Sequence, residues 1–364
     1  MSEDNQNSPP KNNSSRRAFL RKATGLAAGS AVSLSGLVAC GDTPQPTAVP
    51  TTEAITTKAV TSTVLTTAPT TAAISTAQVA NTASTIATTN APTATPVPPI
   101  FRFNIYGDIR TAGLKPPPIF NKLLNMSKEN NPEAAVIVGD IINAEDDDSY
   151  VRQQWAALKE AFAQLGKVQL LPTIGNHDTN YRKGATPLYV ETFANTLPKN
   201  GPDGFVTQVY SLDLGPVHFV SVASELPAQP HQFGKVQMDW LEKDLKANRQ
   251  PYTFVFSHNP AFPVGPHVGN SLDVYPKERD AFWKLLVDNK VTAYVVGHEH
   301  LYNKINKNGV YQLVIGTSGS YPYGGYGGDY YHFATFETTP QGLQMRIIDE
   351  TGKERDKVIF KPSF

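Results

Sequence analysis

The sequence predicts one layered α/β domain over residues 100–364, preceded by a segment without globular character. Residues 1–99 are poor in aromatic residues and rich in Ser, Thr, Ala and Pro, whereas the remainder alternates apolar runs rich in Val, Ile, Phe and Tyr with helix-like segments. Alternation of strands and helices is typical of layered α/β domains. Only the second part can bury a sizeable core.

Residues 1–39 are predicted to be an export signal peptide. Residues 14–22 read Ser-Ser-Arg-Arg-Ala-Phe-Leu-Arg-Lys, which resembles the twin-arginine signal, and the weakly apolar run that follows is too short to span a bilayer permanently. Residues 37–41 read Leu-Val-Ala-Cys-Gly, which resembles the lipobox cut by lipoprotein signal peptidase. This resemblance implies cleavage before Cys40, the only cysteine, and attachment of a diacylglyceryl group to it. The alternative is an accidental arginine pair beside an ordinary amphipathic helix.

Residues 40–99 are predicted to be a disordered tether. They repeat Thr-Thr, Ala-Pro and Thr-Pro elements and carry almost no charge, so they cannot bury enough apolar surface to fold. As a flexible coil the tether would span about 40 Å. Because two acyl chains on Cys40 would provide stable anchoring, we expect an exported, lipid-anchored protein at the outer face of the cytoplasmic membrane or at the cell surface.

The charge balance argues against a nucleic-acid partner. The chain has 32 basic and 32 acidic side chains, and removal of residues 1–39 leaves 27 basic and 30 acidic ones. A surface with this small negative net charge has no electrostatic attraction for nucleic acid. We therefore expect no nucleic-acid polymer as a partner.

Within residues 100–364, five apolar runs with strand character each end in a residue of a type that binds metal ions. The runs are 101–108, 134–140, 168–178, 252–258 and 292–300, and helix-like segments lie near 118–130, 149–165, 233–247 and 276–289. In layered α/β sheets, ligands bind beyond the carboxyl ends of the strands. We therefore expect one edge of the domain to gather Asp, Asn and His side chains.

Such a set of side chains suits hydrolysis of a phosphate ester. The reaction needs a nucleophile at neutral pH and compensation for the charge on the phosphoryl oxygens, and two metal ions about 3.5–4 Å apart provide both. A bridging carboxylate surrounded by carboxylate, amide and imidazole ligands favours Fe, Mn or Zn over Ca. We expect two such divalent or trivalent ions as the cofactors.

The ordered motifs resemble those of the calcineurin-like metallophosphoesterases. They are Gly-Asp-Ile-Arg (107–110), Gly-Asp-Ile-Ile-Asn (139–143), Gly-Asn-His-Asp (175–178), Ser-His (257–258) and Gly-His-Glu-His (297–300). The resemblance covers about residues 101–336, and Gln-Met-Asp-Trp-Leu at 237–241 is similar to the purple acid phosphatase branch. It implies an α/β/β/α sandwich and a phosphoric ester hydrolase with a dinuclear metal centre and a metal-bound hydroxide as nucleophile.

The resemblance also implies roles for individual residues. The six implied metal ligands are Asp108 and His300 on the first ion, Asp140 bridging both ions, and Asn176, His258 and His298 on the second. His177 would lie over the phosphoryl group as an electrostatic stabiliser or general acid. The alternatives are a turn or helix cap for each Gly-Asp pair and a structural role for each histidine.

The first metal site departs from the family pattern at two positions. Many members have Asp-x-His in the first motif, where this chain has Arg110, and purple acid phosphatases have a Tyr three residues beyond the bridging Asp, where this chain has Asn143. Water or Asn143 would fill the gap in the first metal site. Arg110 suits bidentate contact with a phosphate; alternatively it pairs with an acidic residue at 146–148.

Two further features lie on the expected substrate side. His267 falls in a loop that carries histidine near the leaving group in purple acid phosphatases. It is a candidate general acid, because an imidazole can donate a proton at neutral pH; the alternative is a plain loop residue. Residues 320–331 contain five tyrosines that either stack on a sugar or base of the substrate or belong incidentally to a Gly-rich turn.

Taken together, these patterns predict an exported, metal-dependent hydrolase of small phosphate esters. They do not separate a phosphomonoesterase from a phosphodiesterase or nucleotidase, because the same metal core serves both. A catalytically weak surface binding lipoprotein is the alternative from another class, and the departures at Arg110 and Asn143 are its only support.

Overall fold

The computed structural model describes residues 99–363 apart from 112, 145–146 and 183. The predicted signal peptide and nearly all of the predicted tether lie outside the described residues. None of the described helices has both the length and the apolar content needed to cross a bilayer.

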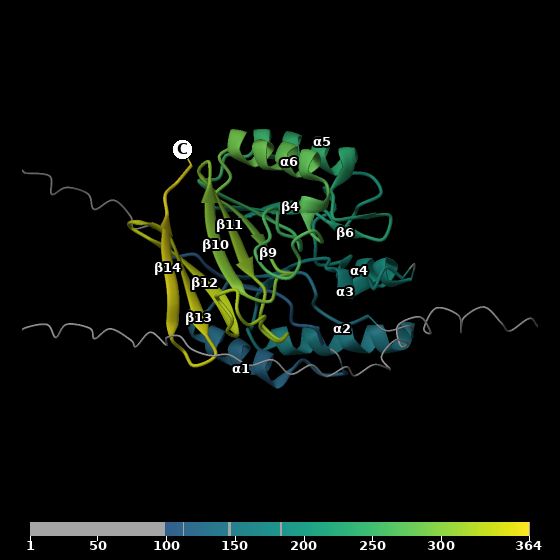
Figure 1. Cartoon of the computed structure of the whole chain (residues 1–364). Coiled ribbons are helices and arrows are strands. Elements are labelled where there is room, and N and C mark those ends of the chain that lie inside the picture. The colour runs from purple at the N-terminus through teal and green to yellow at the C-terminus, as the bar shows by residue number, and fades with distance from the viewer. Residues whose placement is uncertain (1–98, 112, 145–146, 183, 364) are drawn as a thin grey trace, which may run out of the picture. The chain divides into compact units, whose positions relative to one another are not determined.

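Two six-stranded sheets pack against each other, and helices cover the outer face of each (Figure 1). The first sheet has the strand order β14-β13-β12-β1-β2-β3, and the second has the order β10-β11-β9-β8-β5-β4. In Figure 1, α5 and α6 lie on one side of the two sheets and α1 and α2 on the other. This arrangement is an α/β/β/α sandwich, so the predicted fold class is confirmed.

In each sheet, three parallel strands are joined by helical crossovers, and each sequence motif follows one of these strands. The first sheet contains β1 (Arg102–Tyr106), β2 (Ala134–Val138), β3 (Gln169–Thr173), β12 (His332–Thr339), β13 (Gly342–Asp349) and β14 (Glu354–Phe360). The second contains β4 (Tyr210–Leu214), β5 (Val217–Ser221), β8 (Tyr252–Phe256), β9 (Ala293–Val296), β10 (Tyr302–Lys307) and β11 (Val310–Ile315). The strands β1, β2 and β3 are parallel to one another, as are β5, β8 and β9.

Four helices connect these parallel strands. They are α1 (Pro118–Ser127), α2 (Asp148–Ala163), α5 (Gly234–Ala247) and α6 (Pro276–Asp288). The smaller elements are η1 (Lys128–Asn130), α3 (Asn176–Thr179), α4 (Ala185–Phe193), η2 (Leu272–Val274) and the hairpin of β6 (Glu225–Leu226) and β7 (Gln229–Pro230).

Phenylalanine rings from both sheets form the core between them. Phe103 of β1 packs edge-on against Phe219 of β5, with ring centroids 5.0 Å apart, and Phe254 of β8 packs edge-on against Phe336 of β12 at 5.3 Å. Such pairs contribute about 0.5–1.5 kcal/mol each beyond the burial of their area. This packing fixes the two sheets relative to each other, and therefore also the loops at their carboxyl ends.

The predicted helices and strands are present, but each strand ends before its ligand-type residue. The strand β3 ends at Thr173, and residues 176–178 of the predicted run 168–178 belong instead to the one-turn helix α3. The motif residues therefore lie in loops beyond the strands, where their side chains can turn toward a common point.

Candidate metal centre

Ligand-type side chains from both sheets converge at the carboxyl ends of the parallel strands. Those that follow β1, β2 and β3 are Asp108, Asp140 and Asn176, and those that follow β8 and β9 are His258, His298 and His300. All except the half-buried Asn176 are buried. The structure thus brings together the six residues named from the sequence.

The first cluster consists of Asp108, Asp140 and His300, whose ligand atoms lie within 4.8 Å of one another. Nε2 of His300 is 3.4 Å from Oδ1 of Asp108, and the backbone N–H of His298 donates to the Asp108 carboxylate at 3.0 Å. Burial raises the pKa of Asp108 well above its ordinary value, because the attraction of His258 only partly offsets the loss of solvation. A cation between the two carboxylates would remove this penalty.

The second cluster is centred on Nε2 of His258. This atom lies 3.1 Å from Oδ1 of Asn176, 3.2 Å from Nδ1 of His298 and 3.3 Å from Oδ1 of Asp140. Asp140 therefore belongs to both clusters, which is where a carboxylate that bridges two ions would lie.

Backbone carbonyls determine which nitrogen of each histidine carries the proton. Nδ1 of His258 is 2.9 Å from the carbonyl of Val138, Nε2 of His298 is 2.9 Å from that of Asn270, and Nδ1 of His300 is 3.1 Å from that of Tyr321. A carbonyl only accepts, so in the neutral rings these nitrogens donate and the opposite nitrogens present lone pairs. Lone pairs of nitrogen and oxygen therefore face one another in both clusters, and this donor set fits bound Fe, Mn or Zn.

Two motif glycines allow the ligand-type residues to approach so closely. A Cβ on Gly297 would lie 2.2 Å from Oδ2 of Asp108, and one on Gly139, whose φ is +81°, would lie 2.5 Å from Nδ1 of His258. Three ligand-type residues also hold left-handed backbone, namely Asp108 (φ 49°), Asp140 (φ 49°) and His298 (φ 67°). Non-glycine residues in this region are strained, and such strain is concentrated at functional sites.

Asp178 is a supporting residue that the sequence analysis did not single out. Its Oδ1 accepts from the backbone N–H groups of Ile141 and Ile142, at 2.8 and 2.9 Å, and its Oδ2 accepts from that of Gly175 at 2.8 Å. The carboxylate thus joins the loop after β2 to the loop after β3. Its place at the end of the Gly-Asn-His-Asp motif was the only signal in the sequence.

Arg110 and His177 lie together beside the first cluster. Nη2 of Arg110 is 3.2 Å from Nδ1 of His177, and that nitrogen is also 2.9 Å from Oδ1 of Asn143. The backbone N–H of His177 donates to Oδ1 of Asp140 at 2.9 Å. The amide oxygen of Asn143 therefore contacts His177, and burial lowers the pKa of His177 despite the opposing charge of Asp140.

The acidic partners considered for Arg110 are engaged elsewhere where the structure describes them. Asp147 accepts from the backbone N–H of Tyr150 as the N-cap of α2, and Asp148 pairs with Arg182. Residue 146 lies outside the described residues.

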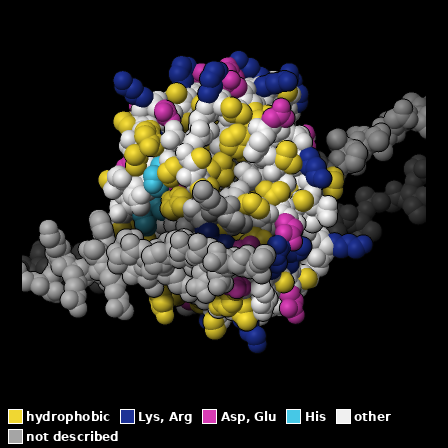
Figure 2. Space-filling model, turned by 90° about the vertical axis from the view of Figure 1, so that its right-hand side faces the viewer, with side chains coloured by type: hydrophobic (Ala, Val, Ile, Leu, Met, Phe, Trp, Pro, Cys, Tyr) yellow, Lys and Arg dark blue, Asp and Glu magenta, His cyan; other side chains and the backbone are white. Residues whose placement is uncertain are grey.

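Two pockets open beside the two clusters. A pocket of about 470 Å³ is bordered by Asn176 and His298 together with Tyr181, His231 and His267. A pocket of about 710 Å³ is bordered by Arg110 and His300 together with Asn143, Tyr321, Tyr323 and Tyr331. Figure 2 shows histidine side chains reaching the surface close together on the face that α3, α4 and β6 border in Figure 1.

His267 and the tyrosine-rich loop both reach this region. The His267 ring packs on that of His298 with centroids 4.0 Å apart, and its Nε2 is 3.1 Å from the hydroxyl of Tyr323. The Tyr323 ring in turn stacks on His300 at 4.3 Å. The backbone N–H of His267 donates to the buried Glu299 at 3.0 Å, which fixes the loop against the last motif.

Comparisons with known proteins identify the family of the chain. Residues 101–302 match the calcineurin-like phosphoesterase family. Human acid phosphatase type 7 is 27% identical over 238 residues, which cover 59% of this chain and 50% of that protein, and mouse tartrate-resistant acid phosphatase type 5 is 32% identical over 98 residues, which cover 26% and 28%. The chain thus spans about half the length, or less, of these curated relatives.

Solved structures share the fold. A purple acid phosphatase from yellow lupin seeds superposes with a TM-score of 0.57 at 18% identity, over 72% of this chain and 55% of that one. A dimetal phosphatase from Danio rerio superposes with a TM-score of 0.56 at 13% identity, over 72% of this chain and 99% of that one.

Proposed function

The chain belongs to the calcineurin-like phosphoesterase family, and on that premise we propose that it hydrolyses small phosphate esters at a centre of two metal ions. The observation that carries the proposal is the convergence of lone pairs in two clusters that share Asp140. Without cations, this arrangement leaves two buried carboxylates close together and imidazole nitrogens facing oxygen atoms.

The two clusters divide the proposed metal ligands. Asp108, Asp140 and His300 would hold the first ion, and Asp140, Asn176, His258 and His298 would hold the second. When bound, Fe, Mn or Zn supplies Lewis-acid stabilisation of negative charge and lowers the pKa of a water nucleophile. The acid phosphatases among the relatives of the chain support a phosphate ester as the substrate.

Three residues are proposed to act on the substrate. The Arg110 guanidinium suits contact with two phosphoryl oxygens at once, and His177 lies beside it, positioned by Asp140 and Asn143. His267 lies on the wall of the neighbouring pocket, next to His298, and is proposed to contact the leaving-group side of the ester.

The two pockets support a second candidate function, hydrolysis of phosphodiesters. One pocket adjoins each cluster, so a phosphoryl group between them would have room for a substituent on either side. A catalytically weak binding lipoprotein is the remaining alternative, supported by the two departures at the first site, Arg110 and Asn143.

We also propose that the protein is exported and anchored through a lipid on Cys40, with residues 1–39 removed and residues 40–99 acting as the tether. The support is the order of the arginine pair, the apolar run and the lipobox-like residues 37–41. Metabolic labelling with a tritiated fatty acid tests the anchor, since Cys40→Ser should abolish the label.

Metal analysis and two chromogenic substrates test the enzymatic proposal. The purified chain is expected to contain about two metal ions by elemental analysis and to hydrolyse para-nitrophenyl phosphate, its bis-ester or both. Asp140→Asn should lose metal and activity together. One ion and no turnover with added Mn, Fe or Zn would favour the binding lipoprotein instead.

A further inference from the structure

A buried carboxylate holds a histidine at the rim of the pocket beside the second cluster. Glu225 begins the hairpin of β6 and β7, its side chain is 0% exposed, and His231 follows the hairpin directly. Oε1 of Glu225 lies 2.9 Å from Nδ1 of His231 as an ion pair, and Oε2 accepts a hydrogen bond of 2.7 Å from the hydroxyl of Tyr181. None of these three residues was singled out from the sequence.

A buried carboxylate is costly unless it is paired, so this arrangement requires a reason. A purely structural reason would be that Glu225 fastens the hairpin to the loop that carries Tyr181. However, His231 also has left-handed backbone, with φ of 61°, and strain of this kind persists where a side chain must be held in a particular direction.

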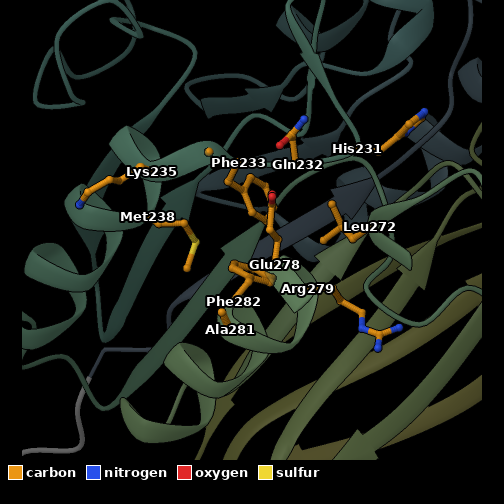
Figure 3. A pocket seen from close by; sticks show the side chains of 11 residues that line it. His231, Gln232, Phe233, Lys235, Met238, Leu272, Glu278, Arg279, Ala281 and Phe282 are labelled. Atoms are coloured by element: carbon orange, nitrogen blue, oxygen red, sulfur yellow. The ribbon is translucent and has the colours of Figure 1, made fainter. Parts of the chain in front are cut away.

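His231 borders two pockets. One is the apolar pocket of about 510 Å³ that Phe282 also lines, and Figure 3 shows the His231 ring pointing away from Phe282. The other is shared with Asn176 and His298. Nδ1 lies 2.9 Å from the Glu225 carboxylate and 3.5 Å from the Asn259 amide nitrogen, so Nδ1 carries a proton toward Glu225. In the imidazolium form that completes the ion pair, Nε2 carries the second proton. Among the described residues, no hydrogen-bond partner for Nε2 is present.

His231 is better placed to carry a proton for the leaving group than His267, which borders the same pocket. Nε2 of His267 already lies 3.1 Å from the Tyr323 hydroxyl. In His231, by contrast, the Glu225 carboxylate contacts Nδ1 and leaves Nε2 available. The contact with Glu225 also raises the pKa of His231 above its ordinary value, against the opposing effect of burial.

We propose that His231, positioned by Glu225, is a catalytic residue that protonates the leaving-group oxygen of the ester from Nε2. The inference rests on the proposed function. A water oxygen forms the new bond to phosphorus while the bond from phosphorus to the leaving oxygen breaks. That oxygen takes the proton from Nε2 of the His231 imidazolium and departs as an alcohol, which leaves His231 neutral with its remaining proton on Nδ1. The ring then regains a proton from solvent, which balances the proton that the water loses.

Leaving-group dependence tests the proposal with the full chain. A para-nitrophenolate departs without a proton, whereas the alkoxide of glycerol 2-phosphate does not. His231→Gln is therefore expected to lower kcat/KM for glycerol 2-phosphate by about 100-fold or more and that for para-nitrophenyl phosphate by less than about tenfold. Glu225→Gln should shift the same ratio in the same direction, with metal content unchanged by elemental analysis.

His218 provides a matched control. It is also flanked by carboxylates, Asp213 at 2.6 Å and Asp244 at 2.9 Å, but it lies near the start of β5, at the opposite end of the strands from the clusters. His218→Gln should leave the ratio of the two activities unchanged. Equal losses on both substrates in His231→Gln, or no loss on either, would overturn the proposal, whereas a wild-type chain inactive on both would instead overturn the proposed function.

Discussion

Removal of metal ions is expected to lower the melting temperature of the chain. The ligand atoms of Asp108 and Asp140 lie within 4.8 Å of each other in a buried site, and two charged carboxylates at that separation repel by about 3 kcal/mol at an effective dielectric constant near 20. An ion present at 100 times its dissociation constant adds about 2.7 kcal/mol of stability. For a domain of this size, that corresponds to a shift of about 5–10 °C for one ion.

Differential scanning calorimetry with EDTA and with added Mn, Fe or Zn measures this shift. Asp140→Asn is informative because it removes the ligand that the two clusters share, so the variant should gain little stability from added metal. His218→Gln should keep the full gain. Equal melting temperatures for wild type with and without these metals would refute the reading of the clusters as metal sites.

Three further predictions follow from single contacts. Gly297→Ala places a methyl group against the Asp108 carboxylate and should lower metal affinity by about 10- to 100-fold in calorimetric titrations. The control Gly113→Ala places its methyl group in open space and should leave metal affinity unchanged. The pKa of His218 is raised, because the effect of its two carboxylate partners outweighs that of burial. Its ion pairs therefore stabilise the fold below the ordinary pKa of about 6.5, and this stabilisation is lost as the pH rises through the raised pKa. His218→Gln should accordingly lower the melting temperature more at pH 5.5 than at pH 9. Arg110→Lys should raise KM for the phosphate ester by about 10- to 100-fold without changing metal content, and an unchanged KM would place Arg110 outside the substrate site.

The parallel strands and their crossover helices could be predicted from the sequence because they are fully buried and therefore continuous apolar runs. All residues of β2, β8 and β9 are buried, and the helices between them carry separate apolar and polar positions. The two-sheet arrangement and the family match confirm the predicted fold class and the predicted family. The roles of individual site residues stay predictions until they are tested.

The parts that sequence reasoning missed depend on contacts between distant or very short segments. The strand β13 alternates buried and half-buried residues and β14 is largely exposed, so neither presents a continuous apolar run. The hairpin that carries Glu225 has strands of two residues each, which is too short for any periodic pattern. The proposed role of His231 depends on its contact with the Glu225 carboxylate, which only the three-dimensional structure shows.

The division of the site between the two sheets has a kinetic consequence. One sheet supplies Asp108, Asp140 and Asn176 and the other supplies three histidines, so neither sheet alone offers a complete ligand set. Metal coordination would then form after the sheets have docked and would have to break before they separate. Interactions of this kind slow unfolding without speeding folding, so the metal-loaded chain should unfold far more slowly than its equilibrium stability alone would suggest.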